Sequence, residues 1–143
     1  MRFRIAFIIT LVFLLGRMAY GAGSPQNGPS KKFYPSGKLE LVQNYKNGKL
    51  DGEVKGYYEN GKLKSIVTFD NGKPDGPYKS YYLDGTLQAE GQFKDGNKFG
   101  VHKIYYPNGK VQSEQIYKNG NLISVKEYDG KGNIIPQIPQ RNK

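Results

Sequence analysis

The chain has 143 residues, enough for one domain, and carries a formal net charge of +10. It contains no cysteine, which excludes disulfides, thiolate metal sites, a thiol nucleophile and a lipid-modified N-terminal cysteine. Its 19 glycines and 12 tyrosines, with no tryptophan, favour short strands and tight turns over helices and leave little material for a large apolar core.

The N-terminal segment has the features of a secretory signal peptide. Arg2 and Arg4 precede a largely apolar run from Ile5 to Leu15. This run is shorter than the roughly 20 residues that a membrane-spanning helix needs. Small residues follow at the two positions that a signal peptidase reads, so we expect a signal helix over residues 1–21 and cleavage after Gly21 or one or two residues later. An uncleaved membrane anchor is the alternative.

Residues 22–32 follow this leader and are rich in Gly, Ser and Pro, a composition typical of a flexible linker. Removal of residues 1–21 takes away three arginines and lowers the net charge from +10 to +7. This charge favours anionic surfaces such as lipid headgroups, acidic glycans or acidic proteins, while an exported protein seldom meets nucleic acid. We therefore expect a periplasmic or secreted protein without a nucleic-acid partner.

A 24-residue repeat dominates residues 33–132. Four aromatic pairs recur at this step: Phe33-Tyr34, Tyr57-Tyr58, Tyr81-Tyr82 and Tyr105-Tyr106. A first turn series follows them at Ser36-Gly37, Asn60-Gly61, Asp84-Gly85 and Asn108-Gly109, and a second lies at Asn47-Gly48, Asn71-Gly72, Asp95-Gly96 and Asn119-Gly120. A third series consists of Gly52, Gly76 and Gly100. Interleaved series on one period indicate four tandem structural units.

The turn pairs predict how each unit folds. Asn-Gly and Asp-Gly favour two-residue hairpin turns, in which both central residues have positive φ. The spacing leaves room for two strands of about six to eight residues per unit, joined by one tight turn and one longer turn such as residues 47–52. Alternation along Leu63, Ser65, Val67 and Phe69 agrees with a strand. We expect an all-β, elongated, single-layer antiparallel sheet of tandem β-hairpins, stabilised by cross-strand ladders.

The pattern Tyr-Tyr-x-x-Gly-Lys followed by Tyr-x-Asn-Gly-Lys-x-x-Gly resembles the variant MORN repeat of bacterial proteins, of the MORN-2 type, among which YwqK-type antitoxin proteins are grouped. The resemblance covers residues 33–132 and implies a β-hairpin array that binds protein or membrane. The fourth unit departs from the pattern, because Ser124 replaces the third-series glycine and the next turn is shifted. This indicates a degenerate C-terminal cap.

A Pro-containing tail, residues 133–143, follows the cap. Its isoleucines are suited to covering the last sheet edge, which would otherwise invite pairing with another strand: Ile134, Ile135 and Ile138.

The sequence predicts no catalytic, cofactor or metal site. His102 is the only histidine, and its repeat position is held by Val54 and Tyr78 in other units, which indicates a packing role. The aspartates fall in or beside turns, where Asp is common for conformational reasons. The glycines recur at hairpin turns rather than in a strand–GxGxxG–helix unit. We therefore expect a protein that is not an enzyme and needs no cofactor; a carbohydrate-active enzyme is the least favoured class.

The candidate binding surface is a row of alternating cations and aromatic rings on one sheet face: Lys55, Tyr57, Lys79, Tyr81, Lys103 and Tyr105. Like members should lie about 9.6 Å apart, a spacing suited to an extended anionic polymer, an acidic headgroup layer or a partner protein. In the alternative interpretation the tyrosines shield the backbone and the lysines only maintain solubility. A second row is expected to pack inside the sheet: Tyr34, Tyr58, Tyr82 and Tyr106.

These features together predict a non-enzymatic exported repeat module that binds a protein or an anionic envelope component, a lipid headgroup or a glycan, through its sheet face. Membrane contact would be peripheral. The resemblance offers a second function, an immunity or antitoxin-like protein that neutralises a partner toxin.

Overall fold

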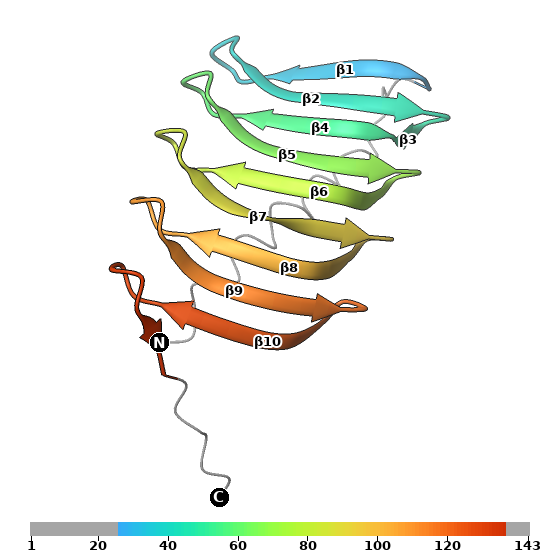
Figure 1. Cartoon of the computed structure of the whole chain (residues 1–143). Helices are drawn as coiled ribbons and strands as arrows, with labels where there is room; N and C mark the ends of the chain where they lie inside the picture. The colour runs from blue at the N-terminus through green and yellow to red at the C-terminus, as the bar shows by residue number, and fades with distance from the viewer. Residues whose placement is uncertain (1–25, 137–143) are drawn as a thin grey trace, which may run out of the picture.

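The computed structural model describes residues 26–136, which form one open antiparallel sheet with no helix among them (Figure 1). The strands are β1 (Gly28–Phe33), β2 (Leu39–Lys46), β3 (Lys49–Leu50), β4 (Gly52–Tyr57), β5 (Leu63–Asp70), β6 (Lys73–Tyr81), β7 (Leu87–Lys94), β8 (Asn97–Tyr105), β9 (Val111–Lys118), β10 (Asn121–Tyr128) and β11 (Ile134–Ile135). They follow one another across the sheet in chain order, and only β3 stands off this path, beside β2.

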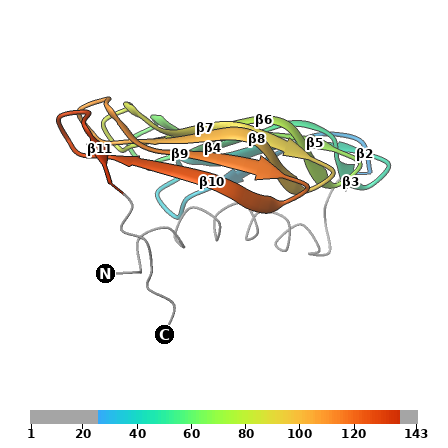
Figure 2. The same cartoon turned by 60° about the horizontal axis from the view of Figure 1, so that its bottom comes forward.

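Figure 2 shows the sheet from near its edge, as a single twisted layer. The all-β, single-layer architecture that the 24-residue repeat predicts is therefore confirmed. The signal helix expected over residues 1–21 lies outside the described residues.

The tight turns lie at the second turn series. Both residues of each pair have positive φ, which defines a type I′ turn: Asn47 and Gly48, Asn71 and Gly72, Asp95 and Gly96, Asn119 and Gly120. Lys46 pairs directly with Lys49 across the first of them, so the connection has only two residues. The expectation of a longer turn over residues 47–52 is therefore wrong. Gly52 does have a positive φ of 93°, but it begins the next strand.

The first turn series forms the longer connections, in which only the glycine has positive φ, 84° at Gly61. The Tyr58 N–H donates to the Lys62 carbonyl at 2.8 Å and closes a three-residue loop. Inside this loop Asn60 Oδ1 accepts a hydrogen bond from the Lys62 N–H at 3.0 Å. The Asn side chain thus stabilises a turn that needs one left-handed residue rather than two.

The two faces of the sheet differ in burial. On the face that carries Val54, Val67 and Tyr78, called the buried face below, apolar side chains form one continuous cluster: Tyr45, Leu50, Val54, Val67, Phe69, Tyr78, Ala89 and Phe93. Along β5 every second residue from Ser65 to Phe69 is buried, as the alternation predicts. The opposite face, called the exposed face, carries Lys55 and Lys79.

The tyrosines of the second row join each unit to the next. Their hydroxyls donate to backbone carbonyls in the following unit, at 2.7 to 2.9 Å: Tyr34 to Tyr57, Tyr58 to Tyr81, Tyr82 to Tyr105 and Tyr106 to Tyr128. At the opposite sheet margin the turn glycines do the same through their backbone N–H groups, as Gly72 does to the Leu50 carbonyl at 2.8 Å. Besides the packing role expected for this row, its tyrosines therefore hold neighbouring units together by hydrogen bonds.

The N-terminal edge begins earlier than expected. β1 starts at Gly28 and pairs with β2 along its length. The expectation of a flexible linker over residues 22–32 is therefore wrong for residues 28–32, which form a strand. Pairing with a neighbouring strand outweighs the Gly, Ser and Pro content of this segment.

At the other edge Ile134 and Ile135 pair with Tyr128 and Glu127, so the start of the tail covers one end of β10. Ile138 lies outside the described residues. Within residues 26–136 no helix is long and apolar enough to cross a membrane.

Candidate functional site

A straight row of lysines crosses the exposed face. Strand register places nine residues beside one another, from β1 to β10: Lys31, Val42, Lys55, Ile66, Lys79, Glu90, Lys103, Glu114 and Lys126. We call these nine the lysine row. It includes the three lysines expected from the sequence and adds Lys31 and Lys126. The sequence pattern missed Lys31 because it lies in the segment expected to be a linker. It missed Lys126 because this residue follows Lys103 by 23 residues instead of 24.

Each of the three expected lysines lies near a carboxylate. Lys55 Nζ is 2.7 Å from Glu53, two residues back on its own strand. Lys103 Nζ is 3.2 Å from Glu114 on the next strand, whereas Lys79 Nζ is 3.9 Å from Glu90. These lysine side chains are still 37 to 50% exposed. Exposed pairs of this kind are weak and screened by salt, so the lysines remain accessible to a ligand.

The carboxylates in the row also bind tyrosines. Tyr105 donates its hydroxyl proton to Glu90 at 2.7 Å, and Tyr128 donates to Glu114 at 3.0 Å. Burial and the Glu90 hydrogen bond raise the pKa of Tyr105 to about 12. Hydrogen bonds from Lys103 and Tyr128 lower the pKa of the Glu114 carboxyl. In the C-terminal half of the row, Glu90, Lys103 and Glu114 are therefore all paired with neighbouring groups.

The N-terminal half differs, because apolar residues occupy the equivalent positions. Val42 and Ile66 stand where Glu90 and Glu114 stand in later units. Among the described residues the hydroxyls of Tyr57 and Tyr81 consequently have no hydrogen-bond partner. This half of the exposed face offers cations, flat apolar groups and free phenol tips.

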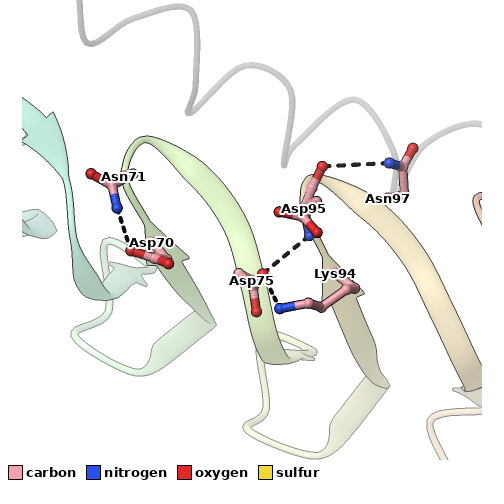
Figure 3. A network of polar contacts seen from close by, with 6 residues as sticks. All are labelled: Asp70, Asn71, Asp75, Lys94, Asp95 and Asn97. Atoms are coloured by element: carbon pink, nitrogen blue, oxygen red, sulfur yellow. Dashed lines mark hydrogen bonds and ion pairs between the residues drawn. The ribbon is translucent and has the colours of Figure 1, made fainter.

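A second polar cluster lies at the margin formed by the tight turns (Figure 3). Asp75 points toward the next turn, where Oδ2 accepts hydrogen bonds from Lys94 Nζ at 3.0 Å and from the Asp95 N–H at 3.1 Å. These donors lower the pKa of Asp75. Asn27 plays the same part for the Asn47 N–H, at 2.9 Å. The carboxylate thus orders a turn, in agreement with the turn role expected for the aspartates.

His102 lies on the buried face, 1% exposed, among the rings of Tyr78, Phe93 and Tyr117. Its Nε2 donates to the Gln92 carbonyl at 2.8 Å, which fixes the tautomer, and Nδ1 has no partner among the described residues. The geometry agrees with the expected packing role. Across residues 26–136 no group of three His, Asp or Glu residues is placed to hold a metal ion.

Comparisons with solved structures found weak likenesses of the fold. The Glycosylation Associate Protein (Gap123) complex from Streptococcus agalactiae is 19% identical over 73% of this chain and 19% of its own, with a TM-score of 0.42. TarM is 12% identical over 80% of this chain and 23% of its own, with a TM-score of 0.46. This chain thus spans about a fifth of the length of each. No curated protein sequence matches it.

The sequence model of the family described as MORN repeat variant matches four segments, residues 26–47, 50–71, 74–95 and 100–119. Each segment ends on the first residue of a tight turn and contains one of the tyrosines whose hydroxyls join the units. The grouping with antitoxin proteins stays a prediction. Since the four matches make up more than half of the sequence, the chain belongs to the family of MORN repeat variants.

Proposed function

We propose that this protein is a non-enzymatic, exported binding module whose exposed sheet face holds an anionic component of the cell envelope, a lipid headgroup or a glycan. One observation carries the proposal: in the N-terminal half of the lysine row Lys31, Lys55 and Lys79 alternate with Val42 and Ile66 instead of carboxylates. At Lys31 and Lys55 a ligand meets positive charge without displacing a cross-strand carboxylate, and Lys79 has one only on its C-terminal side, where Glu90 lies 3.9 Å away.

The spacing and chemistry of this half suit an extended or layered ligand. Neighbouring lysines of the row are two strands apart, about 9.6 Å, so one ligand chain or several headgroups can reach successive ammonium groups. Val42 and Ile66 add apolar contact between them, and tyrosine rings offer a flat surface with a polar tip. The net charge of +7 that is left after removal of residues 1–21 supplies long-range attraction to an anionic surface.

Binding to anionic vesicles, with neutral vesicles for comparison, tests the proposal. Lys31, Lys55 and Lys79 are changed together to Gln, because Glu at positions 55 and 79 would face Glu53 and Glu90. The matched control changes three exposed lysines at the tight-turn margin: Lys46, Lys49 and Lys118. Both variants lose the same charge, so only the position of the charge differs.

At about 1 kcal/mol per lysine near an anionic surface, the row variant should bind tenfold to roughly 100-fold more weakly, and the control far less. Wild-type binding should fall as salt rises. Equal losses in the two variants would show that total charge, not the row, controls binding. The same pair of variants, measured on isolated cell-wall polymer, separates the glycan from the lipid source.

Export is tested on the protein recovered from its producing cells. N-terminal sequencing should begin at residue 22 or one or two residues later, in a fraction outside the cytoplasm. A chain that retains its leader in the cytoplasm contradicts this part of the proposal.

A further inference from the structure

The two edges of the sheet are built differently. β1 carries Pro29, which has no N–H to offer, and the charged residues Lys31 and Lys32, all features that discourage pairing with another strand. On the far side of β10, the described residues pair only at Glu127 and Tyr128, with β11. Within residues 26–136 nothing pairs with the outer side of Asn121–Lys126, although this stretch has a register shift between Leu122 and Ser124 and a charge at Lys126.

Apolar side chains gather next to this open edge. Most of the large apolar residues that are more than 40% exposed lie on the last four strands, β8 to β11: Phe99, Val101, Ile116, Leu122, Ile123, Ile134 and Ile135. At three of these positions the residue 24 places earlier is polar or turn-forming. Asp75 matches Phe99, Pro77 matches Val101 and Gln92 matches Ile116. An exposed apolar patch beside an open strand edge is typical of an association surface.

We propose that a second copy of this chain pairs with the open edge, β10 against β10 in antiparallel orientation about a twofold axis. The register shift between Leu122 and Ser124 lies at the axis, and residues before it oppose residues after it on the same face of the sheet. Leu122 opposes Val125 of the other copy, Ile123 opposes Ser124, and Asn121 opposes Lys126. Apolar residues meet across the axis, and no two like charges face one another.

A head-to-tail arrangement is disfavoured by charge. Pairing β10 with β1 of another copy would bring Lys31 and Lys32 close to Lys126, and Pro29 would leave one ladder position without a donor. The twofold arrangement uses the same edge twice, and it closes after two copies instead of growing into a fibre. It also repeats the strand-to-strand contact that already joins neighbouring units within the sheet.

Sedimentation equilibrium of the protein, as recovered from the cells that produce it, tests the proposal. The wild type should show a concentration-dependent dimer. Ile123→Lys, at a position 61% exposed, should weaken it at least tenfold. Leu83→Lys is the matched control, because Leu83 is 59% exposed but lies in a turn far from β10. A monomer at every concentration, or equal effects of the two substitutions, would overturn the proposal.

Cross-linking tests the register. The chain has no cysteine, so Leu122→Cys and Val125→Cys each carry a single thiol. The two thiols are opposite each other only between one copy of each variant, and a disulfide needs Cα atoms within about 7 Å. Oxidation of an equal mixture should give a linked dimer, and either variant alone should give little. Equal linkage in all three samples would contradict the register.

Discussion

The imidazole of His102 lies so close to Gly91 that a Cβ on Gly91 would be 2.5 Å from Nδ1 and 2.6 Å from Cγ. Real Cβ atoms essentially never come within 3.0 Å of such a neighbour. The equivalent positions in other units carry full side chains: Gln43, Val67 and Gln115. Glycine at position 91 is thus what admits the ring of the only histidine to the buried face.

Gly91→Ala should lower the free energy of unfolding by about 1 to 3 kcal/mol, because the added methyl group forces the buried ring to move. Urea unfolding of the wild type and the variant measures the loss. In a His102→Ala background the same substitution should cost little, since the obstacle is gone. An equal cost in both backgrounds would show that the ring is not the cause.

Burial, and then the positive charge of Lys98, lower the pKa of His102 below its ordinary value of 6.5. The unfolded chain therefore takes up a proton near pH 6.5 while the folded chain still resists it. Stability should be full above this pH and fall as the pH drops below it, by at most about 1.4 kcal/mol per pH unit. Urea unfolding between pH 7.5 and 5 measures the fall.

His102→Val, with the residue that the equivalent position holds at Val54, should abolish the pH dependence in this range. The carboxyl groups with lowered pKa, such as Asp75 and Glu114, act only at more acidic pH. A variant as pH-sensitive as the wild type would assign the effect to another group.

Tyr82→Phe should destabilise the sheet by about 1 kcal/mol, because it removes the 2.7 Å hydrogen bond from the hydroxyl to the Tyr105 carbonyl. Thermal unfolding checks this. Tyr81→Phe is the matched control on the neighbouring residue, since within the described part of the chain its hydroxyl has no partner. A loss of equal size in Tyr81→Phe would show that the two hydroxyls act alike.

Much of the fold is predictable because glycine and asparagine restrict the backbone locally. The recurrence of Asn71-Gly72 and its equivalents gives the number of strands, their lengths and their order. What the pattern does not give is which turn series is tight, because Asn60-Gly61 and Asn71-Gly72 have the same composition. The difference comes from hydrogen bonds, such as that between Asn60 and Lys62, that depend on the folded backbone.

The candidate face is predictable in part, since alternation places Lys55, Lys79 and Lys103 on one side. The carboxylate partners of Lys79 and Lys103 cannot be predicted in this way, because Glu90 and Glu114 lie on neighbouring strands and only the register places them opposite the lysines. Lys126 falls out of the 24-residue step, since the fourth unit has one residue fewer before its last turn.

Gly72→Ala should destabilise the protein by about 1 to 2 kcal/mol, because Gly72 has a φ of 84° that alanine adopts only under strain. Gly130→Ala is the matched control, because Gly130 lies in open space and lacks a positive φ. It should be neutral or slightly stabilising. Unfolding free energies of the two variants test this difference, and equal losses would contradict it.

The bonds between units have a consequence for how this ribbon varies in length. Each tyrosine hydroxyl reaches a carbonyl about 23 residues ahead, and each turn N–H a carbonyl in the unit before it. A whole unit can therefore be duplicated or deleted between equivalent positions, and every tyrosine hydroxyl and turn N–H still finds an acceptor in the neighbouring unit. Each duplication lengthens the ribbon by about 9.6 Å and leaves its cross-section unchanged. The length of the sheet can thus change during evolution in steps of one repeat unit.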